Sequence, residues 1–503
     1  MKKNNASLHA LLGEKKPRFD LRPLWIRGEC EVALTSNVTV TVPQFMVSDK
    51  KQPIAHRDLE LFCERLLELG YNSILLGHRK GTFVSTISSS EATIDFDAIC
   101  SVFHDYQIKV ILKAQIYFSP AQRQFVRSAL DPTYHAFIQS TLQTLIKSVP
   151  HIDYLFWEGD PTQHTFARNT PAFEATGFER LCAEVKLVEE SLNGLPLIYF
   201  LPTTDRQQAT QHATWLADLC DEAGQTTVLA YSALAGDPWL DHLSTHPFWQ
   251  VLQNKSAVSY TPLMPILNIG GVSQGEGLWP VLTMDLLEDY ISRCTHHCFA
   301  GAISLVNHLP ASGTFLDCNL WVTSQVLWRE CSALISTETW FSTFRPDLDF
   351  NQLLPVLRKV REIAIELSFL RALKNEGHRD LISSEECRLI AESLLANLKY
   401  LQLRLTRDAG VALKKERPHF FDYFTCFVRD ARRIIGHFLQ CFNQSLPEAL
   451  LGKDDVQEGF WTAPPKGAFL GKTSDGKLAF LDVPQRGNAG SVMAQIFDEN
   501  RRY

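Results

Sequence analysis

Apolar and polar positions alternate in a strand-then-helix rhythm that continues for about 300 residues. Eight short apolar runs are predicted to be strands, because nearly continuous hydrophobic segments are typical of strands buried on both faces. The predicted strands are Val38–Met46, Ser73–His78, Lys109–Phe118, Tyr154–Trp157, Leu197–Leu201, Thr227–Tyr231, Leu263–Ile269 and Gly301–Val306.

A segment with helical periodicity follows each predicted strand. In the first of these, Leu59, Phe62 and Leu66 recur at spacings of three and four residues, the apolar stripe of a helix packed on a sheet. The predicted helices are His56–Leu69, Phe96–Tyr106, Thr133–Ser148, Phe173–Leu192, Gln207–Ala223, Trp239–Leu252, Met284–His296 and Asp317–Ile335.

Eight units of one strand and one helix make up a (β/α)8 TIM barrel. An open doubly wound sheet is the alternative, but it usually carries a glycine-rich fingerprint after its first strand. Here Pro43-Gln-Phe-Met46 stands in that place. The pattern therefore predicts the α/β class, with a TIM barrel followed by an α-helical C-terminal domain.

The pattern changes after residue 350, where strands cease. Three long amphipathic helices are predicted over Leu353–Leu373, Glu385–Leu405 and Phe420–Phe442, and Ser383–Glu386 fits a capping box. Beyond Gly452 helical periodicity disappears, and the runs 467–470 and 477–483 predict one hairpin. We expect an N-terminal extension (1–30), a barrel (31–345), a helical domain (346–450) and an irregular tail (451–503).

Composition excludes several classes of protein. The chain has 503 residues, 45% hydrophobic and 21% charged, as in ordinary globular proteins, and its net charge of -7 argues against a nucleic-acid binder. No run reaches the roughly 18 apolar residues of a membrane span, and the N-terminus lacks the apolar core of a secretory signal. The 12 scattered cysteines indicate reduced thiols of a cytoplasmic protein.

We expect neither a metal nor a cofactor. The cysteine-histidine cluster Cys294-Thr-His-His-Cys298 lacks a second ligand group at the spacing of a zinc site.

Candidate chemistry lies at the ends of the strands, because TIM barrels place their catalytic groups at the C-terminal face. Glu158 follows the apolar run Tyr154–Trp157 directly. Burial beside Trp157 would disfavour the charged carboxylate, as a general acid requires. The simpler interpretation is that Glu158 or Asp160 caps the next helix or pairs with Arg79.

A glycosidase needs a second carboxylate, as nucleophile or as base for water. Glu276 ranks first, because it lies in the glycine-rich loop Gly270–Gly277 after the seventh strand. Asp237, after the sixth strand, and Asp160, beside Glu158, are the alternatives.

Polar and aromatic residues at the same end of the barrel are candidates for substrate binding, since rings stack on sugars while polar groups bind hydroxyls. Lys113 also supports a rival hypothesis, a Schiff-base lysine acting with the Gly270-Gly271 loop on a phosphorylated sugar, although a paired interior lysine is the simpler interpretation. The substrate-binding candidates are His78, Arg79, Lys113, Tyr117, Trp157, Tyr231, Trp279, Asn307 and His308.

Two segments resemble glycoside hydrolase barrels. Arg57–Leu76, in which a helix ends in Leu-Gly-Tyr-Asn before a strand, is similar to the α-glucuronidase and β-hexosaminidase-like groups. Asn319–Trp328, followed by Phe344-Arg-Pro-Asp347, is similar to their closing barrel helix. The resemblance implies that Glu158 occupies the position of the general acid.

The chain departs from these groups in two ways. Gly159 separates Glu158 from Asp160, where the hexosaminidases have adjacent acids, and Pro265–Ile269 supplies no glutamate at the seventh strand. Despite these departures, the resemblance leads us to expect a glycoside hydrolase-like enzyme that acts on a carbohydrate. The alternatives are a degenerate barrel that binds a glycan or a protein partner, and a lyase or isomerase of a phosphorylated sugar.

Overall fold

The computed structural model covers the whole chain, and part of it is described here. The described residues are 19–26, 30–35, 38–42, 56–77, 96–116, 129–159, 177–200, 214–215, 218–219, 227–232, 263–270, 279–282, 287, 300–306, 310, 314–328, 332–346, 348–375, 383–405, 418–441, 469–472 and 478–480.

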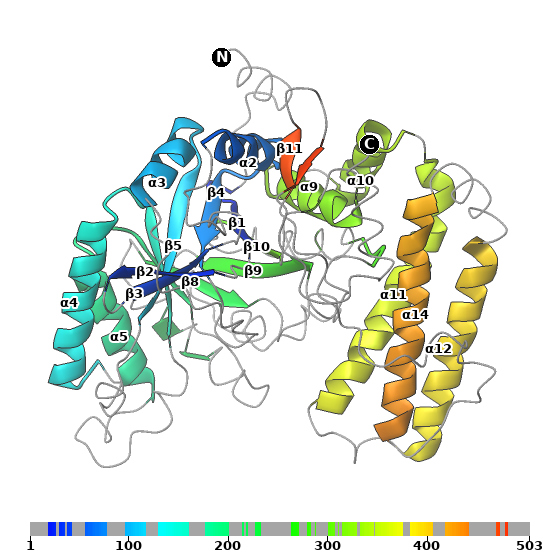
Figure 1. The fold of residues 1–503 in the computed structure, drawn as a ribbon. Helices are drawn as coiled ribbons and strands as arrows, with labels where there is room; N and C mark the ends of the chain where they lie inside the picture. The colour runs from blue at the N-terminus through cyan, green and yellow to red at the C-terminus, as the bar shows by residue number, and fades with distance from the viewer. Residues whose placement is uncertain are drawn as a thin grey trace.

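Eight parallel strands close into a TIM barrel (Figure 1). Closure is made by β1, which pairs with β4 on one side and with β10 on the other, while β5 pairs with β6. In order around the barrel the strands are β1 (Pro23–Ile26), β4 (Ser73–Leu76), β5 (Lys109–Ile116), β6 (Tyr154–Glu158), β7 (Leu197–Phe200), β8 (Thr227–Ser232), β9 (Leu263–Gly270) and β10 (Ile303–Val306).

The first barrel strand differs from the sequence prediction. Val38–Val42 is β3, the second strand of an antiparallel hairpin with β2 (Cys30–Thr35). β3 pairs antiparallel with the C-terminal end of β5, Val38 opposite Ile116 and Val40 opposite Ala114. The prediction of Val38–Met46 as the first barrel strand is therefore wrong, and the barrel begins before the expected boundary at residue 31.

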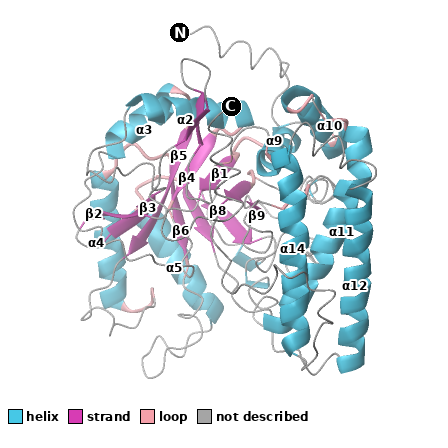
Figure 2. Ribbon diagram, turned by 45° about the vertical axis from the view of Figure 1, so that its right-hand side comes forward, coloured by secondary structure: helices cyan, strands magenta, loops and turns pink. Residues whose placement is uncertain are grey.

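Helices cover the outside of the barrel, and several have nearly the predicted bounds (Figure 2). They are α2 (His56–Leu69), α3 (Phe96–Asp105), α4 (Pro132–Ser148), α5 (Gly177–Ser191) and α9 (Phe315–Trp328). The predicted helix Asp317–Ile335 is two helices, because α10 (Ala333–Phe344) starts after Ser332, whose backbone is extended. The predicted helices at 207–223, 239–252 and 284–296 lie almost wholly outside the described residues.

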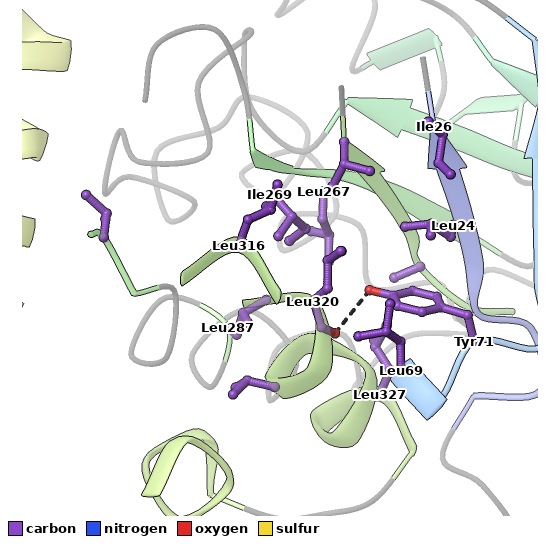
Figure 3. Close-up of a cluster of buried hydrophobic side chains, with 14 of the residues drawn as sticks. Leu24, Ile26, Leu69, Tyr71, Leu267, Ile269, Leu287, Leu316, Leu320 and Leu327 are labelled. Atoms are coloured by element: carbon purple, nitrogen blue, oxygen red, sulfur yellow. Dashed lines mark hydrogen bonds between the residues drawn. The ribbon is translucent and has the colours of Figure 1, made fainter. Parts of the chain in front are cut away.

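Two apolar layers follow from the alternation of side chains along the strands. Ile111, Phe156 and Ile198 belong to a cluster that fills the barrel interior. Leu24 and Leu267 point the other way, into the layer between strands and helices. Figure 3 shows this outer layer at α9, where the Tyr71 hydroxyl donates a 3.2 Å hydrogen bond to the carbonyl of Leu320.

The helical region consists of α11 (Phe350–Asn375), α12 (Ser384–Arg404) and α14 (Pro418–Cys441), which pack on one another (Figure 1). The predicted capping box is confirmed: Ser383 and Glu386 exchange hydrogen bonds at the start of α12. The predicted hairpin is confirmed as well, in β11 (Phe469–Lys472) and β12 (Leu478–Phe480). None of the described helices is long and apolar enough to cross a membrane.

Two buried arginines connect the beginning of the barrel to its end. Arg65 on α2 forms an ion pair with Asp317 on α9, and the two side chains are 3% and 1% exposed. Arg22, next to β1, donates hydrogen bonds to the carbonyls of Phe19 and Gly70 and lies 4.0 Å from the ring centroid of Trp328. Burial lowers the pKa of Arg22 to about 10.

The Arg65–Asp317 pair generates a stability prediction. Arg65→Met leaves a buried carboxylate without its guanidinium, so we expect the free energy of unfolding to fall by about 3–5 kcal/mol. The double variant Arg65→Met/Asp317→Leu should recover most of this loss, because an apolar pair needs no compensating charge. Urea denaturation followed by circular dichroism measures both.

The matched control is Arg57→Met, which breaks the pair Arg57–Glu60 on the exposed side of the same helix. This change should alter stability by less than about 1 kcal/mol. A loss in Arg65→Met no larger than that of the control would contradict the prediction.

Candidate functional site

Two charged side chains, one from the middle of β5 and one from the end of β6, point toward the barrel interior. Successive side chains of a strand point to opposite faces. Ile111 faces the interior, so Lys113 does as well; on β6, Phe156 and then Glu158 face the same way. In the register of the sheet Lys113 lies opposite Phe156. Lys113 and Glu158 therefore meet at the C-terminal end of the barrel, where TIM-barrel active sites lie.

Lys113 and Glu158 form an ion pair between Nζ and Oε2. The side chain of Lys113 is 5% exposed and that of Glu158 is 14% exposed. The expectation of an interior, paired lysine is confirmed, whereas the partner suggested for Glu158, Arg79, lies outside the described residues. Little water screens this pair, so each charge acts strongly on the other and on any group that enters the site.

Aromatic rings form the surroundings of the Lys113 ammonium. Its Nζ lies 5.1 Å from the ring centroid of Trp25 on β1 and 5.9 Å from that of Phe156. The ring of Phe156 in turn lies 5.5 Å from Trp25 and 5.7 Å from Phe200 on β7. Ring faces attract a cation, so these residues hold the ammonium in an apolar environment.

Gly77 allows this close packing. Its carbonyl accepts a 2.6 Å hydrogen bond from the indole N–H of Trp25. Its φ is +143°, and a Cβ at this position would lie 2.4 Å from the Cβ of Lys113. The glycine at the end of β4 thus lets the indole and the lysine approach the same point of the barrel.

The arrangement supports two kinds of chemistry. In the ion pair Glu158 is a carboxylate, which can act as a nucleophile, or as a base that later returns its proton. Lys113 can stabilise negative charge, or act as a nucleophile after transferring its proton to Glu158. The described residues contain no group of three or more His, Cys, Asp or Glu side chains that could hold a metal ion.

Trp157 does not face Glu158, contrary to the expectation that it buries this carboxylate. Its side chain points outward, and its indole N–H donates a 2.9 Å hydrogen bond to Glu184 on α5. Phe156 and Trp25 are the rings near the ion pair instead. The alternation of side chains could have identified Phe156, since it lies two residues before Glu158.

Tyr231 and Trp279 also lie away from the ion pair. Tyr231, on β8, belongs to the layer between strands and helices. Trp279 contacts α14, where its N–H donates a 3.0 Å hydrogen bond to Asp430 and its ring packs edge-on against Phe427. These two rings therefore support the barrel wall and its contact with the helical region.

The spacing of the acids after β6 has a steric cause. A Cβ at Gly159 would lie 2.3 Å from the hydroxyl oxygen of Tyr199, a buried residue of β7. Position 159 also faces away from the interior, so an acid there would not point toward Lys113. The absence of two adjacent acids in Glu158-Gly159-Asp160 follows from this packing.

The remaining candidates lie outside the described residues and stay predictions: His78, Arg79, Tyr117, Asp160, Asp237, Glu276, Asn307 and His308, together with the cluster Cys294–Cys298.

Comparison with known proteins yields structural matches alone. No model of a protein family matches the chain, and no curated protein sequence matches it. A mutant O-GlcNAc hydrolase of Thermobaculum terrenum is 10% identical, with 85% of this chain and 86% of that one covered and a TM-score of 0.41.

Two further matches come from different classes of enzyme. The catalytic domain of the major endoglucanase of Xanthomonas campestris is 11% identical, with 61% of this chain and 95% of that one covered and a TM-score of 0.32. Dihydrodipicolinate synthase of Rhodopseudomonas palustris is 11% identical, with 72% of this chain and 89% of that one covered and a TM-score of 0.33. At these values the chemistry has to be inferred from the residues of this barrel.

The packing at Gly77 generates a prediction. Gly77→Ala should lower the free energy of unfolding, both because φ is positive and because the new methyl group meets Lys113. The matched control is Gly194→Ala, where φ is +90° but no atom lies within 4 Å of the new Cβ. The control carries the cost of a positive φ, about 1–2 kcal/mol, without a steric contact.

We expect Gly77→Ala to lose at least about 1 kcal/mol more than Gly194→Ala, the ordinary cost of overpacking. Urea denaturation of both variants measures the difference. Equal losses would show that Lys113 does not pack against Gly77.

Proposed function

We propose that the protein is a glycoside hydrolase-like enzyme in which Glu158 is a catalytic carboxylate. One observation carries the proposal: Glu158 faces the barrel interior at the C-terminal end of β6 and is held there by Lys113 of the neighbouring strand. Glycosidases work with a pair of carboxylates, and barrel enzymes place them at strand ends.

The pairing with Lys113 narrows the role of Glu158. A general acid must carry a proton to the glycosidic oxygen, whereas the carboxylate of Glu158 contacts the ammonium of Lys113. In the resting enzyme Glu158 therefore fits a nucleophile or a base better than the proton donor that the resemblance implies. Lys113 would be a positioning residue, which orients the carboxylate.

The other groups of the reaction come from the predicted residues. Glu276, Asp237 or Asp160 would supply the second carboxylate. His78, Arg79, Asn307 and His308 would bind hydroxyl groups or a carboxylate of the sugar. Trp25, Phe156 and Phe200 are fully buried, so they form the floor beneath the reacting groups and are not a stacking surface.

Replacement of Glu158 tests the proposal. We expect Glu158→Gln to lower kcat on a panel of aryl glycosides by at least about a hundredfold, because the amide neither attacks nor transfers a proton. The dependence of kcat on the leaving group of the aryl glycoside distinguishes a nucleophile from a general acid at position 158. A nucleophile is needed for every substrate, whereas a general acid is dispensable for a dinitrophenyl group, which departs without protonation.

The control is Glu190→Gln, an exposed carboxylate on α5 that should leave kcat unchanged. Turnover by Glu158→Gln at the rate of the control would exclude Glu158 from catalysis. Thermal denaturation of both variants verifies that they are folded.

A second candidate function is a lyase or isomerase that acts through Lys113 on a phosphorylated sugar. The observation that favours it is the contact of Lys113 Nζ with Glu158 in an aromatic environment, since a desolvated lysine that transfers its proton becomes a neutral amine. The amine would attack a substrate carbonyl and release water, which leaves an imine.

Borohydride reduction tests this second candidate. A substrate imine reduced to a secondary amine would add mass to the peptide that contains Lys113, and Lys113→Arg should abolish the label. If the wild-type protein is neither labelled nor active on glycosides, the remaining alternative is a barrel that binds a glycan or a protein partner without catalysis.

A further inference from the structure

α12 carries apolar residues on two faces. The inner face packs against α11 and α14, and its buried residues recur at spacings of three and four. They are Cys387, Ala391, Leu394, Leu398, Leu401 and Leu405, with Leu395 buried beside them. This face accounts for the position of α12 in the helical region.

α12 lies at the edge of the helical region (Figure 1), and its outer face has a second apolar stripe. Leu389, Tyr400 and Leu403 are 53%, 50% and 55% exposed. Ser393 and Ala396 lie between them and are exposed as well, so the five positions follow a spacing of four, three, four and three. At 3.6 residues per turn they fall within an arc of roughly 80°, the seam of a helix that pairs with another helix.

The charges beside this stripe divide into two halves. The N-terminal half of α12 carries Glu385, Glu386 and Glu392 with Arg388, so it is acidic. The C-terminal half carries Lys399 and Arg404 and is basic. Ala396, a small residue that permits close approach of another helix, lies at the centre of the stripe.

We propose that this stripe is a docking surface for a second copy of the chain, paired antiparallel about a twofold axis at Ala396. In this arrangement Leu389 lies opposite Leu403 of the partner subunit. Glu392 and Lys399 lie on the same flank of the stripe. Across the axis, Glu392 of one subunit therefore lies near Lys399 of the partner subunit. A twofold interface requires a surface that complements itself, and the two halves of α12 do so in both shape and charge.

The second flank agrees with the same axis. Glu386 and Arg404 lie on this flank, at nearly equal distances along the helix from Ala396. Two copies would therefore bring Glu386 near Arg404 of the partner subunit. An unrelated partner protein would need no such symmetry within one helix, so the self-complementary charges favour a second copy.

Sedimentation velocity over a range of concentrations tests the proposal on the full chain. We expect the wild-type protein to dimerise reversibly. Leu403→Asp should raise the dissociation constant of the dimer by at least about tenfold, because the change occurs twice in a symmetric interface. The control is Ile335→Asp, which alters an apolar residue of α10 that is 61% exposed and lies outside the stripe. This control should dimerise like the wild type.

Charge exchange gives the sharper test. Lys399→Glu and Glu392→Lys should each weaken the dimer, because like charges then meet across the axis. The double variant should restore it. Because the substituted side chains are exposed, we expect every variant to keep its helix content, which circular dichroism verifies.

A wild-type protein that stays monomeric at high concentration would overturn the proposal and leave the stripe to a different partner. A dimer that survives Leu403→Asp, or that the double charge exchange fails to restore, would place the interface elsewhere. Each result can be told apart from the reaction at Glu158, because in the described part of the chain α12 packs against α11 and α14.

Discussion

Closure of the barrel is the constraint on which the rest of the structure depends. A closed parallel sheet must bring its first strand beside its last, so β1 pairs with β4 and with β10 although it has four residues. Four residues contribute few backbone hydrogen bonds to the sheet, and contacts between the outer helices add to the closure of the barrel. Arg65 and Asp317 join α2 to α9 across the same junction. Arg22 fixes the chain where it enters β1.

The same junction builds the floor of the candidate site. Trp25 projects inward from β1 and reaches both the carbonyl of Gly77 and the ammonium of Lys113. A strand that serves closure thus supplies the ring that desolvates the ion pair. Because Trp25 and Gly77 come from neighbouring strands, a shift in the register of β1 would move the indole away from Lys113.

The sequence predicted those features that one segment can specify by itself. The bounds of α2 follow from its amphipathic stripe, and the place of Glu158 follows from an apolar run that ends in an acid. β1 was missed because it is short, while Val38–Val42 alternates like a strand and belongs to the hairpin. Pairing of strands depends on partners distant in the chain, which local periodicity does not report.

The error at Trp157 has a different origin. The residue is adjacent to Glu158 in the sequence, but adjacent residues of a strand lie on opposite faces of the sheet. Counting by two from Glu158 leads to Phe156, and counting by two from Ile111 leads to Lys113. Those two steps, joined by the parallel register of β5 and β6, predict the ion pair without knowledge of the rest of the barrel.

Two ion pairs of the described part of the barrel, Arg65–Asp317 and Lys113–Glu158, differ in their surroundings. A buried pair adds little to stability compared with apolar residues of the same size, so its presence calls for another reason. Arg65–Asp317 lies between two helices in the outer wall, where it joins α2 to α9. Lys113–Glu158 lies inside the barrel, where Glu158 at the C-terminal end of β6 is 14% exposed. The same kind of interaction thus joins two helices in the outer wall and, in the function proposed for Glu158, would hold a carboxylate where a substrate could reach it.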